Sequence, residues 1–168
     1  GDYVWGFLNW ENYTAVSQPD SLYKIDPSLG PLSHAISVRG MPGLTAEVGM
    51  LELGQPKRGE TVFVSAASGA VGSIAGQLAR LAGARVIGSA GTDKKVDHLL
   101  NNLGFDAAFN YKTTPTRDAL RQFCDDGVDV YFDNVGGSTL DATLGYLNPF
   151  ARIPVCGQIS GYNSTTDT

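Results

Sequence analysis

Residues 61–72 read Thr61-Val62-Phe63-Val64-Ser65-Ala66-Ala67-Ser68-Gly69-Ala70-Val71-Gly72. The apolar, β-branched first part predicts a buried strand. Small residues follow at once, and from Val71 onward hydrophobic side chains recur at spacings of three and four, which predicts one face of an α-helix. A strand, a tight turn and a helix in this order form the first half of a dinucleotide-binding unit.

The turn matches Ala67-x-Gly69-x-x-Gly72, a G-x-G-x-x-G pattern whose first glycine is alanine. Gly69 lets backbone N–H groups approach a pyrophosphate with no Cβ in the way, and Gly72 lets the helix lie close to the strand. A Gly/Ala-rich turn of any α/β protein is the alternative, but the flanking strand and helix favour a nucleotide. We therefore predict a pyrophosphate site made by Ala67, Ser68, Gly69, Ala70, Val71 and Gly72.

Length and composition favour one compact α/β domain and disfavour binding to nucleic acid or to a membrane. Only 17% of the 168 residues are charged, against about 25% in an average domain, which is consistent with buried parallel strands. The net charge of −5 comes without a basic block, and no apolar run approaches the ~18 residues of a membrane helix. Cys124 and Cys156 have no CxxC spacing, so we expect free thiols in a reducing, cytoplasmic compartment.

Strands and helices are predicted to alternate along the rest of the chain. Further strands are expected at 85–89, 107–109, 128–132 and 152–156, and helices at 42–53, 94–103, 115–124 and 138–146. Asp93 is expected to cap the second of these helices and Gly104 to occupy its C′ position. This alternation predicts a doubly wound parallel sheet, a Rossmann fold of three layers, with a sixth strand beyond the chain.

The first 40 residues have a different pattern. Residues 3–7 and 10–16 are aromatic and strand-like without a crossover helix, and Pro19, Pro27 and Pro31 follow. We predict that residues 1–26 are the end of a preceding β-rich domain and that residues 27–168 form the nucleotide-binding domain. The chain begins without Met and ends in a polar stretch, so we expect it to be a fragment.

The residues after the second strand bear on the choice of cofactor. An NAD site usually has an acidic residue there to bind the ribose hydroxyls, whereas this chain has Ser89-Ala90-Gly91. Lys94, Lys95 and the Tyr111-Lys112 pair lie in segments that can reach a 2′-phosphate, although a solvated helix face is an alternative for the two lysines. Asp93 is the one acid nearby, at the expected cap position. This pattern favours NADP over NAD.

Five motifs occur in order along the chain: MPGLTA at 41–46, GETVFVSAASGAVG at 59–72, FNYK at 109–112, YFDNVGG at 131–137 and CGQISGYN at 156–163. They closely resemble the zinc-independent medium-chain dehydrogenase/reductases, in particular the NADPH-dependent alkenal/one double-bond reductases, which include prostaglandin and leukotriene reductases. One departure is Glu47, where an aromatic residue is expected. The resemblance implies a GroES-like substrate domain, whose remnant is residues 1–26, before a truncated Rossmann domain. It also implies a homodimer of the full-length protein.

The resemblance implies a reaction in which hydride passes from NADPH to the β-carbon of an α,β-unsaturated ketone or aldehyde and the enolate is protonated at the α-carbon. Tyr162, just past the fifth expected strand, is the candidate acid. No metal is implied, and His34, His98 and the two cysteines show no ligand spacing. Besides the residues of the turn, the implied cofactor-binding residues are Thr45, Gly91, Lys95, Tyr111, Asn134, Cys156, Gly157 and Tyr162.

Two alternatives remain open from the sequence. A quinone reductase of the same superfamily would have the same cofactor site and a flat aromatic acceptor in place of the small-molecule enone or enal. A cofactor-binding fragment without activity is the other, and we expect the isolated chain to be inactive. A short-chain dehydrogenase is disfavoured, because none of the seven tyrosines is followed by Lys four positions later.

Overall fold

The computed structural model describes residues 1–164, and its contacts divide the chain into two units, Gly1–Leu44 and Thr45–Thr168. In the first unit, β1 (Val4–Trp5) pairs antiparallel with β2 (Tyr23–Lys24), and the rings of Trp5 and Tyr23 stack at 4.8 Å. Three short 3-10 helices follow or flank them, at Pro19–Ser21, Pro27–Leu29 and Leu32–Ile36.

The strand expected at 10–16 does not form, and the one expected at 3–7 is reduced to two residues. A two-stranded pair of this length offers too few partners to hold a longer strand. The assignment of residues 1–26 to a substrate domain stays a prediction, as does the boundary after residue 26.

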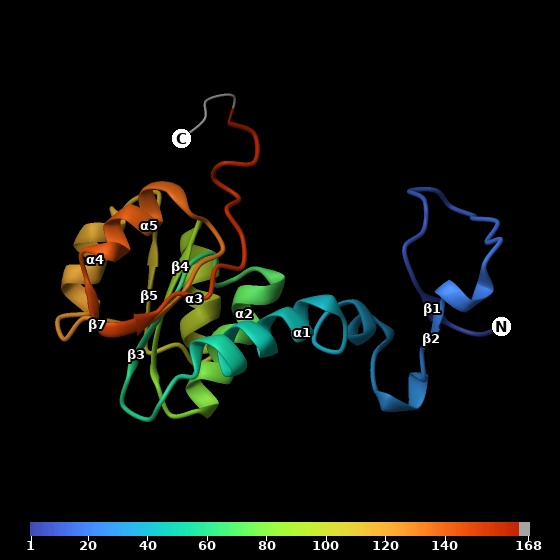
Figure 1. The fold of residues 1–168 in the computed structure, drawn as a ribbon, viewed down its shortest axis with the longest axis horizontal. Helices are drawn as coiled ribbons and strands as arrows, with labels where there is room; N and C mark the ends of the chain where they lie inside the picture. The colour runs from blue at the N-terminus through green and yellow to red at the C-terminus, as the bar shows by residue number, and fades with distance from the viewer. Residues whose placement is uncertain (165–168) are drawn as a thin grey trace. The chain divides into compact units, whose positions relative to one another are not determined.

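The second unit contains the predicted parallel sheet (Figure 1). Its strands are β3 (Thr61–Val64), β4 (Arg85–Ala90), β5 (Ala107–Asn110), β6 (Val128–Phe132) and β7 (Leu147–Arg152). They lie in the order β5-β4-β3-β6-β7, and every pair is parallel. The chain therefore builds the sheet outward from β3 in both directions, and the α/β doubly wound fold is confirmed.

Both faces of this sheet are buried. The strands are connected through α2 (Ala70–Leu81), α3 (Asp93–Asn101), α4 (Thr116–Phe123) and α5 (Gly137–Leu144). Along β3, Val62 and Val64 join one hydrophobic cluster and Phe63 joins the other. Phe63 stacks on Phe109 at 5.9 Å and on Tyr131 at 5.1 Å. Burial on both faces accounts for strands that are continuously apolar and not alternating.

The helix expected at 42–53 is present, but it changes from an α-helix to a π-helix along its length. It begins as α1 (Met41–Glu47) and continues as a π-helix over Val48–Gly54. In the part belonging to the second unit, Ala46 and Met50 are fully buried. A Cβ on Gly49 would lie 2.6 Å from the Phe132 ring, so the absence of a side chain there lets this helix lie against the end of β6.

Three details of the predicted elements were wrong. The last strand is Leu147–Arg152, and of the expected 152–156 only an isolated bridge from Val155 to Asp133 forms. Pro154 lacks the N–H that would continue the ladder. The α3 cap is Thr92, whose hydroxyl accepts from the Lys95 N–H at 3.3 Å, and not Asp93. Gly104, with φ +71°, lies one position beyond the expected C′, because the helix ends at Asn101.

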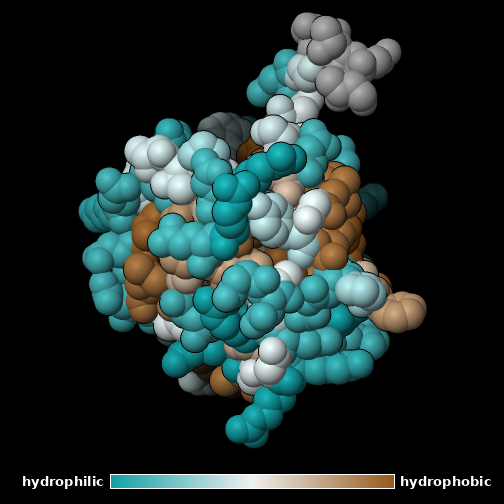
Figure 2. Space-filling model, turned by 90° about the vertical axis from the view of Figure 1, so that its left-hand side faces the viewer, coloured by the Kyte–Doolittle hydropathy of each residue, from teal (hydrophilic) through white to brown (hydrophobic). Residues whose placement is uncertain are grey.

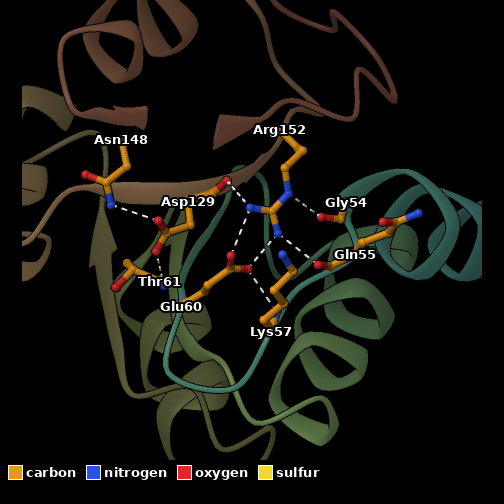
Figure 3. Close-up of polar contacts among 8 residues, drawn as sticks. All are labelled: Gly54, Gln55, Lys57, Glu60, Thr61, Asp129, Asn148 and Arg152. Carbon is orange, nitrogen blue, oxygen red and sulfur yellow. Dashed lines mark hydrogen bonds and ion pairs between the residues drawn. The ribbon is translucent and has the colours of Figure 1, made fainter. Parts of the chain in front are cut away.

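The amino end of the sheet is held together by one guanidinium group (Figure 3). Arg152 binds both carboxylate oxygens of Glu60, at 3.0 and 2.6 Å, and donates to the carbonyls of Gly54 and Gln55 at 2.9 and 2.8 Å. It thus joins the end of β7, the residue before β3 and the end of the π-helix. This bidentate pair holds the pKa of Glu60 below its ordinary value, chiefly through the hydrogen bond from Arg152.

On the side of the molecule where α4, α5 and β7 lie, the surface is largely hydrophilic, with hydrophobic side chains in separate patches (Figure 2). No helix among residues 1–164 is both long enough and apolar enough to cross a membrane.

The Arg152–Glu60 pair predicts a pH-dependent loss of stability. Glu60→Gln should lower the free energy of unfolding by about 2 kcal/mol at pH 7, because the guanidinium loses its charged partner in a mostly buried setting. The carboxylate pKa is lowered in the folded state, so this contribution is present above the unfolded pKa and is lost as pH falls through the folded one. Urea unfolding should therefore show the gap between variant and wild type narrowing below about pH 4.

Glu52→Gln is the matched control, since Glu52 is an exposed acid on the π-helix. It should change stability by less than about 0.5 kcal/mol at either pH. A gap for Glu60→Gln that stays constant from pH 7 to pH 3 would contradict a role for the Glu60 charge.

Candidate functional site

The carboxyl ends of the strands meet at one edge of the sheet, as they must in parallel pairing. The segments that follow β3, β4, β5 and β6 begin there, at Ser65, Gly91, Tyr111 and Asp133. The strand order reverses between β3 and β6. In doubly wound sheets the crevice outside this point is where ligands bind.

The turn after β3 is shaped by backbone contacts at Ala66. This residue has φ +47°, a left-handed conformation unusual for alanine, and its carbonyl accepts from the Gly69 N–H at 2.9 Å. A Cβ on Gly72 would lie 2.6 Å from that same carbonyl oxygen. Gly72 is thus required for α2 to begin this close to the strand, which is the role its sequence position suggested.

The start of α2 faces the carboxyl edge without a side-chain cap. Gly69 is the N-cap residue and makes no side-chain hydrogen bond. The first N–H groups of a helix have no intrahelical acceptors, and the helix dipole adds partial positive charge there. Ala70 and Val71, in the first turn of α2, present backbone groups, whereas Ala67 is fully buried and packs in the core.

A pocket of about 240 Å³ opens beside this turn. It brings together Ser68, Gly69, Gly91, Lys95 and Tyr111, all predicted from the sequence to bind a cofactor. Lys112 also lines it, whereas Lys94 does not. Sequence reasoning missed three further lining residues: Ala66, Ala90 and Thr92. A polar residue just after a strand, such as Thr92, was the available signal.

The polar side chains in and beside this pocket give it a positive rather than a negative character. The Tyr111 hydroxyl lies over Gly91, where a Cβ would come within 3.0 Å of it. Asp93, the acid nearest the end of β4, accepts from the Asn110 side-chain amide at 2.7 Å. The two pocket lysines are exposed and form no ion pair among residues 1–164. As far as residues 1–164 are concerned, the pocket therefore presents ammonium groups and no lining carboxylate.

The remaining predicted residues cluster at the end of β6. The N–H groups of Cys156 and Gly157 donate to the Asp133 carbonyl at 2.8 and 3.1 Å. The Asn134 amide donates to the Ser65 carbonyl at 2.7 Å, which ties the end of β6 to the end of β3. Tyr162 is 67% exposed, and its hydroxyl accepts from the Gln158 N–H at 3.1 Å. Its hydroxyl hydrogen is therefore available to another acceptor.

Beneath this cluster lies a buried polar network that the sequence did not reveal. The Asp133 carboxylate accepts from the Tyr131 hydroxyl at 2.6 Å and from the Val135 and Gly136 N–H groups at 2.9 Å. Burial, followed by the hydrogen bond to Asp133, raises the pKa of Tyr131 far above its ordinary value. An acid directly after an apolar strand was the signal for this network.

Thr45 lies on α1, is half-buried and makes a polar contact of its own. It does not line the pocket beside the glycine turn. Within the described residues, no group of three or more His, Cys, Asp or Glu side chains is placed to hold a metal ion.

Comparison with known proteins identifies the family. Residues 70–167 match the family model of the zinc-binding dehydrogenases. The chain belongs to this family. It is 51% identical over 164 residues to the NADP(+)-dependent 2-alkenal reductase of Nicotiana tabacum, covering 97% of the chain and 48% of that protein. The chain spans about half the length of the curated relatives it matches.

Solved structures of similar proteins share this fold. CurA from Vibrio vulnificus in complex with NADPH superposes with a TM-score of 0.81 and 46% identity, over 87% of this chain and 43% of that one. The Escherichia coli quinone oxidoreductase complexed with NADPH gives 0.74 and 27%, over 88% and 45%. The resemblance to NADP-dependent double-bond reductases that the motifs indicate is thereby confirmed.

The geometry of the turn makes Gly72→Ala a test of the close approach between α2 and β3. The added Cβ would lie 2.6 Å from the Ala66 oxygen and 2.9 Å from the Ala67 Cα, both backbone atoms. Unfolding in urea should show a loss of roughly 1–3 kcal/mol, typical of overpacking. Gly145→Ala is the control, because its Cβ would meet no atom closer than 3.8 Å. If the two variants are equally stable, α2 tolerates a larger separation than the structure has.

Proposed function

We propose that the protein containing this chain is an NADPH-dependent reductase of the carbon–carbon double bond of α,β-unsaturated ketones and aldehydes. The observation that carries the proposal is the pocket beside the glycine turn, where Lys95 and Lys112 converge and Asp93 is held by Asn110. A 2′-phosphate needs cations and the absence of a competing carboxylate there. The 2-alkenal reductase relative and the CurA–NADPH complex support the same cofactor.

The residues at the carboxyl edge fit the parts of this dinucleotide. The uncapped start of α2 suits a pyrophosphate, which binds to the free N–H groups of a first helical turn. Gly69 leaves the approach open because it has no Cβ, while its own N–H donates to the Ala66 carbonyl. The ribose phosphate would lie in the pocket of Gly91, Lys95, Tyr111 and Lys112. The other half of the cofactor would then extend past the point between β3 and β6 where the strand order reverses. Beyond it lie Asn134, Cys156, Gly157 and Tyr162, which cluster at the end of β6.

In the proposed reaction NADPH supplies a hydride to the β-carbon, and the chain's own residues position and protonate. Tyr162 is proposed as the donor to the enolate, since its hydroxyl accepts one hydrogen bond from Gln158 and keeps its proton for another acceptor. A phenol hydroxyl is a weak acid, which donates well only to an oxygen that becomes basic during the reaction. The substrate, an enone or enal, would be held by the substrate domain.

Quinone reduction is the second candidate, because the Escherichia coli quinone oxidoreductase shares this fold with NADPH bound. The higher identity to the 2-alkenal reductase favours double-bond reduction. Steady-state turnover of an enone and of a benzoquinone by the same preparation separates the two. We further propose that the full-length protein is a homodimer. The two free thiols lead us to propose a cytoplasmic location as well.

Cofactor preference tests the phosphate pocket. The full-length protein should bind NADPH at least tenfold more tightly than NADH, about 1.4 kcal/mol of discrimination. Lys95→Ala should narrow that difference, because the phosphate loses a charge-assisted contact. Lys94→Ala, a change of the same kind one residue away and outside the pocket, should leave it intact. Equal Kd values for the two cofactors in the wild type, measured by calorimetry, would refute the pocket assignment.

Substitution of the proposed acid tests the chemistry. Tyr162→Phe in the full-length protein should lower kcat on a simple enone about tenfold to a hundredfold, the low end for a general acid, because water can also protonate an enolate. The Kd for NADPH should change much less, since the contact forms only in the transition state. Tyr146→Phe, near the opposite end of the sheet, is the control. Unchanged kcat in Tyr162→Phe would exclude this residue as the donor.

A further inference from the structure

The Asp133 side chain is completely buried and unevenly hydrogen-bonded. Its Oδ1 accepts from the Tyr131 hydroxyl, the Val135 and Gly136 N–H groups and, at 3.3 Å, the Ser65 hydroxyl. Its Oδ2 is buried without any hydrogen-bond partner in the described part of the chain. All its hydrogen bonds fix the orientation of the carboxylate, and one oxygen remains uncompensated.

In the part of the chain that the structure describes, no cation forms an ion pair with this carboxylate. Among residues 1–164 the ion pairs are Asp2–Lys24 and Glu60–Arg152, and neither involves Asp133. Buried carboxylates are normally paired, because an isolated buried charge is costly. The electric field of Asp133 also reaches the residues that cluster at the end of β6. Burial, followed by the charge of Asp133, raises the pKa of the Cys156 thiol.

The position of Asp133 relates this charge to one half of the proposed cofactor. Asp133 follows β6, next to β3 at the reversal of strand order, and its backbone carbonyl holds the N–H groups of Cys156 and Gly157. The lysine pocket lies beyond β4 on the other side of the turn. A dinucleotide that places its phosphorylated ribose in that pocket has its nicotinamide on the β6 side.

We infer that Asp133 is the fixed negative charge that favours the oxidised, cationic nicotinamide at this site and thereby promotes hydride release. The inference rests on the proposed function. When a hydride, one proton with two electrons, leaves the neutral reduced ring for the β-carbon of the substrate, the ring becomes a cation and the substrate an enolate. The enolate then takes a proton at its α-carbon. Asp133 exchanges no proton or electron and acts through its charge and through the turn that it orients.

The size of the effect follows from Coulomb's law. For any two opposite unit charges about 10 Å apart, at an effective dielectric constant of about 20, the attraction corresponds to roughly a tenfold change in affinity. A neutral ring of the same shape feels little of this. Removal of the charge should therefore weaken binding of NADP⁺ relative to NADPH roughly three- to twentyfold. Hydride transfer should slow as well.

The experiment measures the Kd of NADP⁺ and of NADPH for the full-length protein by calorimetry. Asp133→Asn keeps the shape and the acceptor oxygen, and should raise the ratio of Kd(NADP⁺) to Kd(NADPH) at least threefold. Asp133→Glu, which keeps the charge, should raise the ratio less than Asp133→Asn does. If circular dichroism shows that Asp133→Asn does not fold, Asp133→Ser replaces it, since a hydroxyl can also accept from the following N–H groups.

Asp129→Asn is the matched control on the same strand. Asp129 accepts from the Thr61 N–H and the Asn148 amide, both at 2.8 Å, at the opposite end of β6. It should leave the ratio within twofold of the wild type. An unchanged ratio in a folded neutral variant at position 133, or an equal shift in Asp129→Asn, would overturn the inference. Failure of the wild type to bind either nucleotide would instead overturn the proposed function.

Discussion

β3 is buried on both of its faces, and the other elements of the second unit are arranged around it. Thr61–Val64 lies in the middle of the sheet, paired with β4 on one side and β6 on the other, and its apolar side chains enter both hydrophobic clusters. A strand so enclosed can leave the sheet only through a tight turn at its end. The turn therefore uses small residues and a left-handed Ala66, and the same compactness brings the uncapped start of α2 to the edge where ligands bind.

Charged side chains are paired at one end of the sheet and unpaired at the other, within the described residues. At the amino end, the charges of Arg152 and Glu60 satisfy each other, and the guanidinium also binds the carbonyls at the end of the π-helix. At the carboxyl end, within residues 1–164, Lys95 and Lys112 form no ion pair with an acid and Asp133 is a buried acid without a cation. The exposed lysines are therefore accessible to a ligand, whereas Asp133 is completely buried and can act on one only through its electric field.

Local sequence patterns predicted most of the sheet and the glycine turn. The period of the hydrophobic residues reports burial directly, so β3 to β6 and the four helices between the strands were found with errors of a few residues. The failures have separate physical causes. Thr92 caps α3 in place of Asp93, because both residue types can cap a helix. β7 lies earlier than expected, because Glu60 holds Arg152 and Pro154 cannot extend the ladder.

The fold class, the glycine turn after the first buried strand and the lack of a carboxylate after the second could be predicted from the sequence alone, because each depends on residues close together in the chain. The shared pocket of Lys95, Tyr111 and Lys112 and the hydrogen bond from Asn110 to Asp93 became visible only in the folded chain. It alone also showed that Asp133 is buried between Ser65 and Tyr131. Contacts between strands far apart in sequence arise from the order of the sheet, which no local pattern of residues encodes.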